Sequence, residues 1–184
     1  MEKAIKKIVV IGPESTGKSS LCKALSEHYK TIWVKEFARE YLERNGKDYV
    51  FEDLYKIALG QLGEIENAVV KVGIQQEANT QNLLFIDTDL YVIKIWSEFV
   101  FNKCDNKILT LITKQQYDLY LLCDVDLPWV NDNLREYPNL KVRQKLFHYY
   151  KEETAAQKTP WKIISGNYDE RTVAAIKFID QHLK

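Results

Sequence analysis

Short apolar runs alternate with longer segments of mixed polarity along the whole chain. The runs are four or five residues long, which is strand length, and most of their positions are apolar rather than alternating. Strands of this kind are typical of a parallel sheet that helices cover on both faces. We therefore predict an α/β fold with a five-stranded parallel sheet. The predicted strands are residues 8–11, 31–34, 83–86, 119–123 and 161–164.

The segments between these strands have the spacing of apolar residues that is typical of helices. We predict helices from about residue 18, over 36–44, from 51 to about 79, over 90–101 and over about 170–182. Gly60, Gly63 and Gly73 lower the helix propensity of the long third segment. No stretch rich in proline, glycine or serine divides the 184 residues, so we expect a single domain over residues 1–184.

The charge balance limits the classes of partner. Lysine plus arginine is 26 and aspartate plus glutamate is 26, which argues against a general nucleic-acid binder. No apolar run reaches the about 18 residues of a membrane-spanning helix, and the run at 8–11 is too short for a signal peptide. The three cysteines form no C-x-x-C pair, which favours reduced thiols. We expect a cytoplasmic protein that binds neither nucleic acid nor membranes.

A glycine-rich motif follows the first predicted strand and precedes the first predicted helix. Residues 12–19 read GPESTGKS and match the P-loop pattern G-x-x-x-x-G-K-[ST]. In such a loop the backbone N–H groups and the helix N-terminus bind phosphate oxygens, Lys18 reaches the β- and γ-phosphates, and Ser19 ligates Mg²⁺. The alternative is a glycine turn without a ligand. The motif predicts a Mg·ATP site formed by Gly12, Glu14, Ser15, Thr16, Gly17, Lys18, Ser19 and Ser20.

Two further strands end in acidic residues. The carboxyl ends of parallel strands open on one cleft, so we expect Asp87 to hold Mg²⁺ together with Ser19. Glu36 is our first candidate for the base near an acceptor hydroxyl, and Asp89 is the second. The alternative for Asp89 is a cap of the next helix. Arg39 shares a helix face with Glu36 and could anchor a polar substrate, with a surface salt bridge as the competing account.

Residues 124–135 after the fourth strand form a predicted loop that contains a proline, two asparagines and Trp129. In a P-loop kinase a loop at this place closes over the nucleotide as a lid and brings arginines to the transferring phosphoryl group. We assign this task to Arg135 and Arg143, because a guanidinium offers several donors to spreading charge. The alternative is a surface loop with a half-buried tryptophan.

Four segments, taken in order, resemble one family. They are residues 12–19, the segment WVKEFAREY at 33–41, Asp87-Thr88-Asp89, and Trp129-x-x-Asp132-x-x-Arg135. They are similar to the C-terminal ribosylnicotinamide kinase domain of the bacterial NadR proteins, and the similarity covers nearly the whole chain. The full bacterial proteins also carry a DNA-binding module and an adenylyltransferase domain. The chain resembles neither, so we do not expect transcriptional regulation or adenylyl transfer.

This resemblance implies a kinase-type P-loop NTPase fold with a lid after the fourth strand. It implies ATP as donor, Mg²⁺ as cofactor and a small-molecule nucleoside as substrate, with nicotinamide riboside phosphorylated at its 5′-hydroxyl to nicotinamide mononucleotide. The catalytic residues would be Lys18, Glu36, Asp87, Arg135 and Arg143. The substrate site would include Trp33, Glu36, Arg39, Asp89, Trp129 and Asp132.

Two positions depart from the family pattern. Aromatic side chains are expected to flank the nicotinamide ring, but Lys35 and Asn67 occupy the aligned positions. Trp33 lies two residues before Lys35, on the same face of the strand, and is the expected replacement. Two other functions stay open: an ATP- or GTP-gated binding module without an acceptor, and an ATPase that acts on a protein partner.

Overall fold

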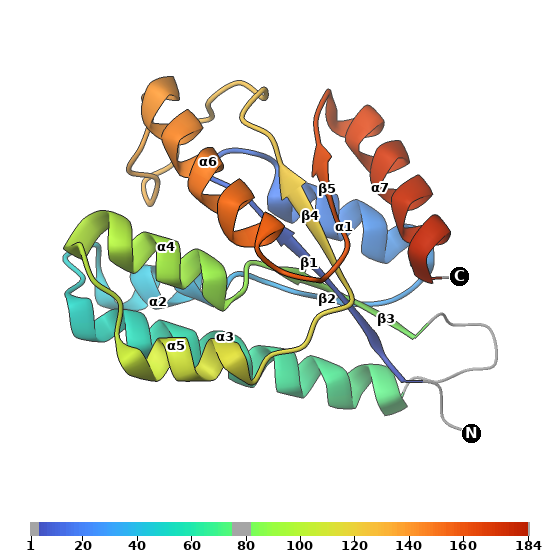
Figure 1. The fold of residues 1–184 in the computed structure, drawn as a ribbon, viewed down its shortest axis with the longest axis horizontal. Helices are drawn as coiled ribbons and strands as arrows, with labels where there is room; N and C mark the ends of the chain where they lie inside the picture. Colours follow the sequence, from blue (N-terminus) through green and yellow to red (C-terminus); the bar gives the residue numbers. More distant parts are fainter. Residues whose placement is uncertain (1–3, 75–81, 184) are drawn as a thin grey trace.

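The computed structural model describes residues 4–74 and 82–183. Its five strands are parallel and form one sheet of order β2-β3-β1-β4-β5 (Figure 1). The predicted α/β fold is therefore confirmed. The strands are β1 (Lys6–Ile11), β2 (Trp33–Val34), β3 (Leu83–Asp87), β4 (Leu119–Cys123) and β5 (Trp161–Ile164).

Strand β2 is shorter than the predicted 31–34. Only Trp33 and Val34 pair with β3. The backbone N–H of Thr31 instead donates to the carbonyl of Ser26, so this residue still belongs to the turn that ends the first helix.

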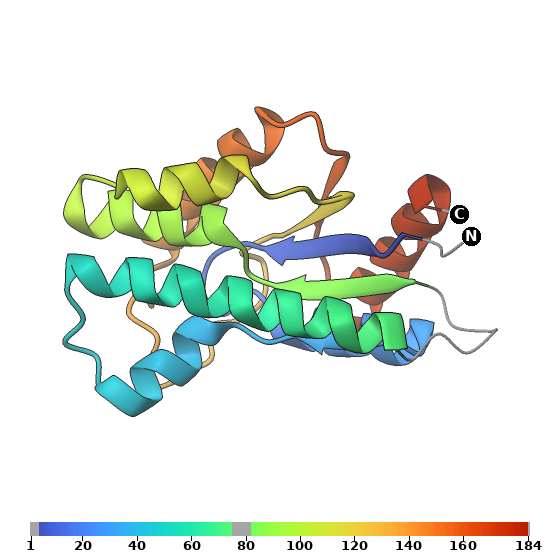
Figure 2. The ribbon, with the colours of Figure 1, turned by 90° about the horizontal axis from the view of Figure 1, so that it is seen from below.

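Helices cover both faces of the sheet (Figures 1 and 2). Helices α1 and α7 pack on one face, while α3, α4 and α6 pack on the other. The helices are α1 (Lys18–Tyr29), α2 (Phe37–Asn45), α3 (Phe51–Ile74), α4 (Leu90–Phe101), α5 (Asn106–Thr113), α6 (Leu140–Ala155) and α7 (Tyr168–Leu183). No helix within the described ranges combines the length and the apolar character that a membrane span requires.

The alternation of side chains along β1 explains the two layers. Ile8 and Val10 pack with α1 and α7, whereas Val9 and Ile11 pack with α3, α4 and α6. All four side chains are almost completely buried. A third apolar cluster joins α2 to α3, α4 and α5 beyond the edge of the sheet. The phosphate loop therefore begins at the end of a strand that is packed on both faces.

Helices α5 and α6 are not among those that the sequence predicts. Each begins with a side-chain cap, because Asp105 accepts from the backbone N–H of Lys107 and Asn139 accepts from that of Lys141. Helix α3 passes through its glycines. A β-carbon at Gly60 would lie 2.1 Å from the ring of Phe37, so the glycine makes room for α2. The predicted end of this helix near residue 79 lies outside the described residues.

Candidate active site

The loop between β1 and α1 has a backbone that depends on its glycines. Gly12 has a φ of +141° and Gly17 a φ of +77°, a region that other residues adopt only with strain. A β-carbon at Gly12 would also lie 2.7 Å from the carbonyl oxygen of Cys123. The sheet and these glycines together hold the loop around the N-terminus of α1, where backbone N–H groups and the helix dipole favour an anion.

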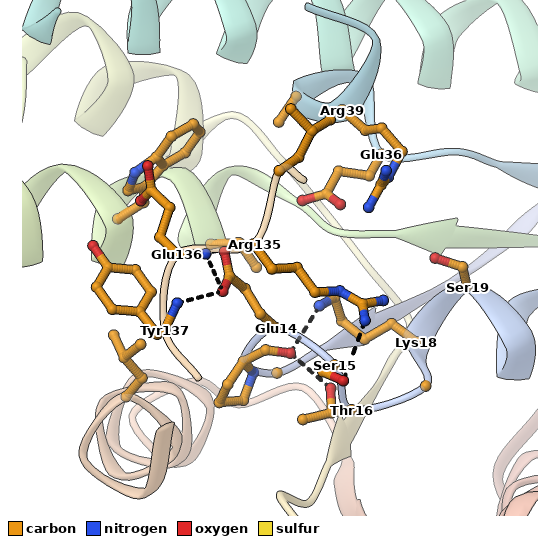
Figure 3. Close-up of a pocket in the computed structure, with 18 of the residues that line it drawn as sticks. Glu14, Ser15, Thr16, Lys18, Ser19, Glu36, Arg39, Arg135, Glu136 and Tyr137 are labelled. Atoms are coloured by element: carbon orange, nitrogen blue, oxygen red, sulfur yellow. Dashed lines mark hydrogen bonds between the residues drawn. The ribbon is translucent and has the colours of Figure 1, made fainter. Parts of the chain in front are cut away.

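Lys18 and Ser19 begin α1 at this anion site. The Nζ of Lys18 donates to the carbonyl of Pro13 at 3.0 Å (Figure 3). The hydroxyl of Ser19 donates to Asp87 at 2.5 Å. Phosphate oxygens arriving in the loop would offer Lys18 a stronger, charged acceptor than the carbonyl. The lysine is therefore free to exchange its partner when a nucleotide binds.

Asp87 is buried at the end of β3. Its exposed fraction is 1%, and burial together with the nearby charge of Glu36 raises its pKa to about 6, although Lys18 acts in the opposite direction. A cation beside this carboxylate would relieve the cost of burying its charge. The oxygens of Asp87 and Ser19 are ligands of the kind that Mg²⁺ prefers. The two residues therefore fit a magnesium site.

The protein alone supplies only part of such a site. The described residues contain no cluster of three or more His, Cys, Asp or Glu side chains that could hold a metal. Magnesium commonly keeps several waters and binds through one or two protein groups plus substrate phosphates. A Mg²⁺ ion here would accordingly depend on the phosphates of a nucleotide.

A pocket of about 310 Å³ extends from the phosphate loop toward α2, α4 and α6 (Figure 3). Its phosphate end consists of residues 12–20. Its other end has a mostly apolar wall, with Glu36 and Arg39 from the start of α2 and Glu136 from the segment before α6. The residues of that end include Glu36, Ala38, Arg39, Leu42, Val92, Trp96, Phe99, Tyr137, Leu146 and Tyr150. The pocket thus joins a phosphate site to a half-enclosed aromatic chamber.

The segment between β4 and α6 packs over the phosphate loop, and two residues of that loop, Glu14 and Ser15, accept hydrogen bonds from it. The carboxylate of Glu14 accepts from the backbone N–H groups of Glu136 and Tyr137 at 2.9 and 3.0 Å (Figure 3). The hydroxyl of Ser15 accepts from the backbone N–H of Val130 at 2.9 Å. The predicted lid, residues 124–135, therefore lies against the phosphate loop through Val130, and the two residues after it do so as well; we call the whole segment between β4 and α6 the lid.

Arg39 and Asp132 tie this lid to α2. Their side chains form an ion pair at 3.0 Å, and Arg39 also lies 3.8 Å from Glu43. Arg39 therefore forms a salt bridge, as the competing account expects, and its partner Asp132 belongs to the lid. Arg39 lines the pocket and Asp132 does not.

Glu36 lies at the junction of the two ends of the pocket. It precedes the first residue of α2, and its carboxylate forms no hydrogen bond or ion pair within the described part of the chain. It is close enough to Asp87, Arg39 and Tyr150 to shift their pKa values. An unpaired carboxylate at this position can accept a proton from a hydroxyl group of a bound substrate.

Asp89 does not reach the pocket. Its exposed fraction is 0%, and its carboxylate accepts from the backbone N–H groups of Tyr91 and Val92 and from the hydroxyl of Tyr120. Burial raises its pKa to about 6. The expectation that Asp89 belongs to the substrate site is therefore wrong, and the helix cap is its role.

Replacing Asp89 with alanine should lower stability without removing a pocket residue. We expect a loss of about 2–4 kcal/mol, from the lost cap and from the buried Tyr120 hydroxyl left without its acceptor. Urea unfolding of the variant measures this loss. Tyr120→Phe, which removes only the hydroxyl, should cost less. A variant as stable as the wild type would contradict the role of Asp89 as a cap.

Three positions considered for the acceptor ring point elsewhere. Trp33 packs with the cluster between the sheet and helices α1 and α7, whereas the pocket wall comes from the opposite face. The expectation that Trp33 replaces a missing ring-flanking residue is therefore wrong. Lys35 and Asn67 are exposed and do not line the pocket either. Their substitution consequently leaves the pocket wall unchanged.

The two predicted arginines differ in position. Arg135 lines the pocket and donates to the hydroxyl of Ser15 at 3.3 Å and to the carbonyl of Val130 at 2.5 Å. Arg143 is 4% exposed, and its guanidinium lies 5.2 Å from the ring centre of Trp129. Its Nε and Nη1 have no hydrogen-bond partner among the described residues, and burial lowers its pKa. Neither Arg143 nor Trp129 lines the pocket.

Several pocket residues were not found from the sequence. Trp96 and Phe99 lie one turn apart on α4, and their spacing predicts only that they share a helix face. Tyr168 starts α7 and packs beside Gly17 at the phosphate end. One signal in the sequence could have predicted Trp96 and Phe99 as pocket residues: α4 begins directly after the acidic end of β3.

The fold and the site together define a P-loop protein of the kinase type, with a phosphate loop, a neighbouring buried carboxylate and an arginine-bearing lid. More particularly, the chain belongs to a family described as an AAA domain, whose model matches residues 7–171. The predicted resemblance to the NadR kinase domain is also confirmed by relatives and by solved structures.

Two curated relatives are trifunctional NAD biosynthesis/regulator proteins NadR. The one from Salmonella typhimurium is 30% identical over 135 residues, which are 71% of this chain and 31% of that protein. The one from Escherichia coli is 26% identical over 180 residues, which are 95% of this chain and 42% of that protein. The chain therefore spans less than half the length of these relatives.

Solved structures share the fold over almost the whole chain. A crystal structure of NadR protein in complex with NR has a TM-score of 0.75 and 19% identity. The match covers 97% of this chain and 50% of the NadR chain. A thymidylate kinase from Ehrlichia chaffeensis has a TM-score of 0.66 and 11% identity. This match covers 96% of this chain and 100% of the thymidylate kinase chain. At these identities the likeness is one of fold.

Proposed function

We propose that the chain is an ATP-dependent kinase that phosphorylates the 5′-hydroxyl of a nucleoside, with nicotinamide riboside as acceptor. The observation that carries this proposal is the shape of the pocket. It joins the phosphate loop to an aromatic chamber, and the unpaired carboxylate of Glu36 lies between them. A nucleoside whose ring occupies the chamber would place its sugar hydroxyl near both Glu36 and the donor phosphates. The fold shared with a crystal structure of NadR protein in complex with NR supports nicotinamide riboside in particular.

Each polar residue has one task in this reaction. A Mg²⁺ ion held by Ser19 and Asp87 would offset the charge of the donor phosphates. Lys18 binds the β- and γ-phosphates. Glu36 accepts the proton of the acceptor hydroxyl while the oxygen of that hydroxyl attacks the γ-phosphorus. Adenosine diphosphate leaves, and the phosphoryl group remains on the nucleoside.

The lid supplies positive charge during transfer. Arg135 is held at the phosphate loop by Ser15, so a small change of its side chain brings its guanidinium to the transferring group. Arg143 is buried with its guanidinium near the ring of Trp129 and does not line the pocket, so it would have to change position to reach a phosphate. We accordingly propose Arg135 as the first residue to offset this charge and Arg143 as the second.

A transfer screen tests the proposal. Labelled ATP and Mg²⁺ are incubated with nicotinamide riboside, cytidine, uridine, adenosine and a thiamine-like alcohol, and labelled products are separated. We expect nicotinamide mononucleotide to form with a kcat/KM at least about tenfold above that of the other acceptors, because the chamber discriminates between rings. The Lys18→Ala protein is the blank. Slow hydrolysis of ATP with no labelled acceptor would instead identify a nucleotide-gated module.

A further inference from the structure

The aromatic end of the pocket carries a carboxylate that is fixed in position. The Nε1 of Trp96 donates to the hydroxyl of Tyr49 at 2.8 Å, and this hydroxyl donates to the carboxylate of Glu136 at 3.0 Å. Trp96 and Glu136 both line the pocket, and Figure 3 shows Glu136 next to Tyr137 on the side away from Ser19. This chain of hydrogen bonds joins α4, the segment before α3, and the lid.

Packing holds Tyr49 in this position. Its ring lies edge-on to the ring of Trp96 with a centroid distance of 4.7 Å, and edge-on to the ring of Phe101 at 6.1 Å. The backbone of Glu136 is fixed as well, because its N–H donates to Glu14. The carboxylate of Glu136 is therefore linked to the indole ring through Tyr49, although the residue itself is exposed to solvent.

The charge of Glu136 has no cationic partner among the described residues. It forms no ion pair, and the side chain of its neighbour Arg135 turns toward Ser15 and the phosphate loop. Arg39 pairs with Asp132 on the lid. Among the described residues, Glu136 is thus an unpaired carboxylate at the aromatic end of the pocket and Glu36 is one at the junction, while Lys18 and Arg135 lie at the phosphate end (Figure 3).

Lys145 is a further cation near this aromatic wall. Its Nζ lies 5.8 Å from the ring centre of Phe99, but it lines a separate surface groove between α4 and α6 rather than the pocket. It therefore does not supply the missing partner of Glu136 inside the chamber.

An aromatic face next to a carboxylate favours a ring that carries positive charge. Such a ring gains a cation–π interaction with the indole and a Coulomb attraction to the carboxylate, whereas a neutral ring of the same shape gains only stacking. We propose that Glu136, positioned by Tyr49 and Trp96, makes the acceptor site select a positively charged aromatic ring. This inference rests on the proposed function and assigns the specificity of its acceptor site to a residue outside all four family motifs.

Two acceptors of one shape test the proposal. Nicotinamide riboside has a cationic ring, and its dihydro form has the same sugar and carboxamide on a neutral ring. The kcat/KM ratio of the two is measured for the wild type and for Glu136→Gln. We expect the preference for the cation to fall about fivefold, the size of a partly exposed charge interaction, through KM for the cation alone. Raising the salt concentration should weaken this preference in the wild type but not in the variant.

Two further variants separate the charge from its position. Tyr49→Phe keeps the charge but removes the hydroxyl that links Glu136 to Trp96, so part of the preference should be lost. Glu66→Gln removes the same charge from an exposed position on α3 that does not line the pocket, and it should behave as the wild type.

The outcomes distinguish this inference from the proposed function. If Glu136→Gln changes both acceptors equally, or changes neither, the inference is wrong while the kinase activity on nicotinamide riboside stands. If the wild type phosphorylates neither riboside but accepts another nucleoside, the proposed acceptor and this inference are both overturned.

Discussion

Replacing Lys18 with alanine is expected to lower phosphoryl transfer at least about a hundredfold in a protein that still folds, the size of effect seen when one preorganised charge or donor is removed. The side chain lines the pocket and, among the described residues, donates to the carbonyl of Pro13 alone. That carbonyl also accepts from the hydroxyl of Thr16, so it keeps a partner in the variant. Turnover with labelled ATP and nicotinamide riboside measures the loss.

Lys23→Ala is the matched control for this variant. Lys23 lies on the same helix and is exposed. Its Nζ is 3.9 Å from the carboxylate of Glu27, which is a weak ion pair, so its removal should leave turnover and stability unchanged. Thermal unfolding of both variants shows whether each has folded. A folded Lys18→Ala protein with turnover near that of the wild type would contradict the proposed role of Lys18 in phosphoryl transfer, and with it the kinase assignment.

The fold could largely be predicted because its strands are short apolar runs. β4 and β5 begin and end where the sequence predicts, since all their neighbours in the chain are polar or turn residues. The length of β2 depends instead on a tertiary event, the hydrogen bond that keeps Thr31 in the turn after α1. Helices α5 and α6 begin at single capping residues whose effect becomes visible only when the following backbone is helical.

The phosphate end of the site could also be predicted, because it combines one contiguous motif with a topological rule. The P-loop specifies its own backbone, and the carboxyl ends of parallel strands place Asp87 and Glu36 beside it. The same rule fails for Asp89. Thr88 has a φ of +77°, which breaks the alternation of an extended strand, so that the carboxylate two residues after Asp87 turns toward Tyr120.

The aromatic end could not be predicted from local patterns. Trp96 lies on α4 and Tyr137 on the lid, and Tyr150 comes from α6. Nothing in the separation of these residues along the chain indicates that they meet, and each reads as an ordinary core residue in its own helix or loop. Alignment to family positions directed attention to Lys35 and Asn67 instead. Only the packing of α4 and α6 against the lid assembles this wall.

Glu36 then provides the second large effect that we expect. Glu36→Gln keeps the shape of the side chain but cannot accept a proton, so kcat should fall about a hundredfold, within the range for a general base. The KM values for ATP and for the acceptor should change little, because the carboxylate has no hydrogen-bond or ion-pair partner among the residues that the structure describes. Single-turnover kinetics with nicotinamide riboside measure the chemical step directly.

Glu40→Gln is the control, since it removes an exposed carboxylate from the same helix, and this carboxylate pairs with Arg44 alone among the described residues. It should leave kcat unchanged. The transition state of phosphoryl transfer is loose, so a base contributes less when the leaving proton is lost late. A Glu36→Gln protein with normal kcat but a raised KM for the acceptor would therefore show that this carboxylate positions the hydroxyl group. Proton removal would then fall to solvent or to the phosphate itself.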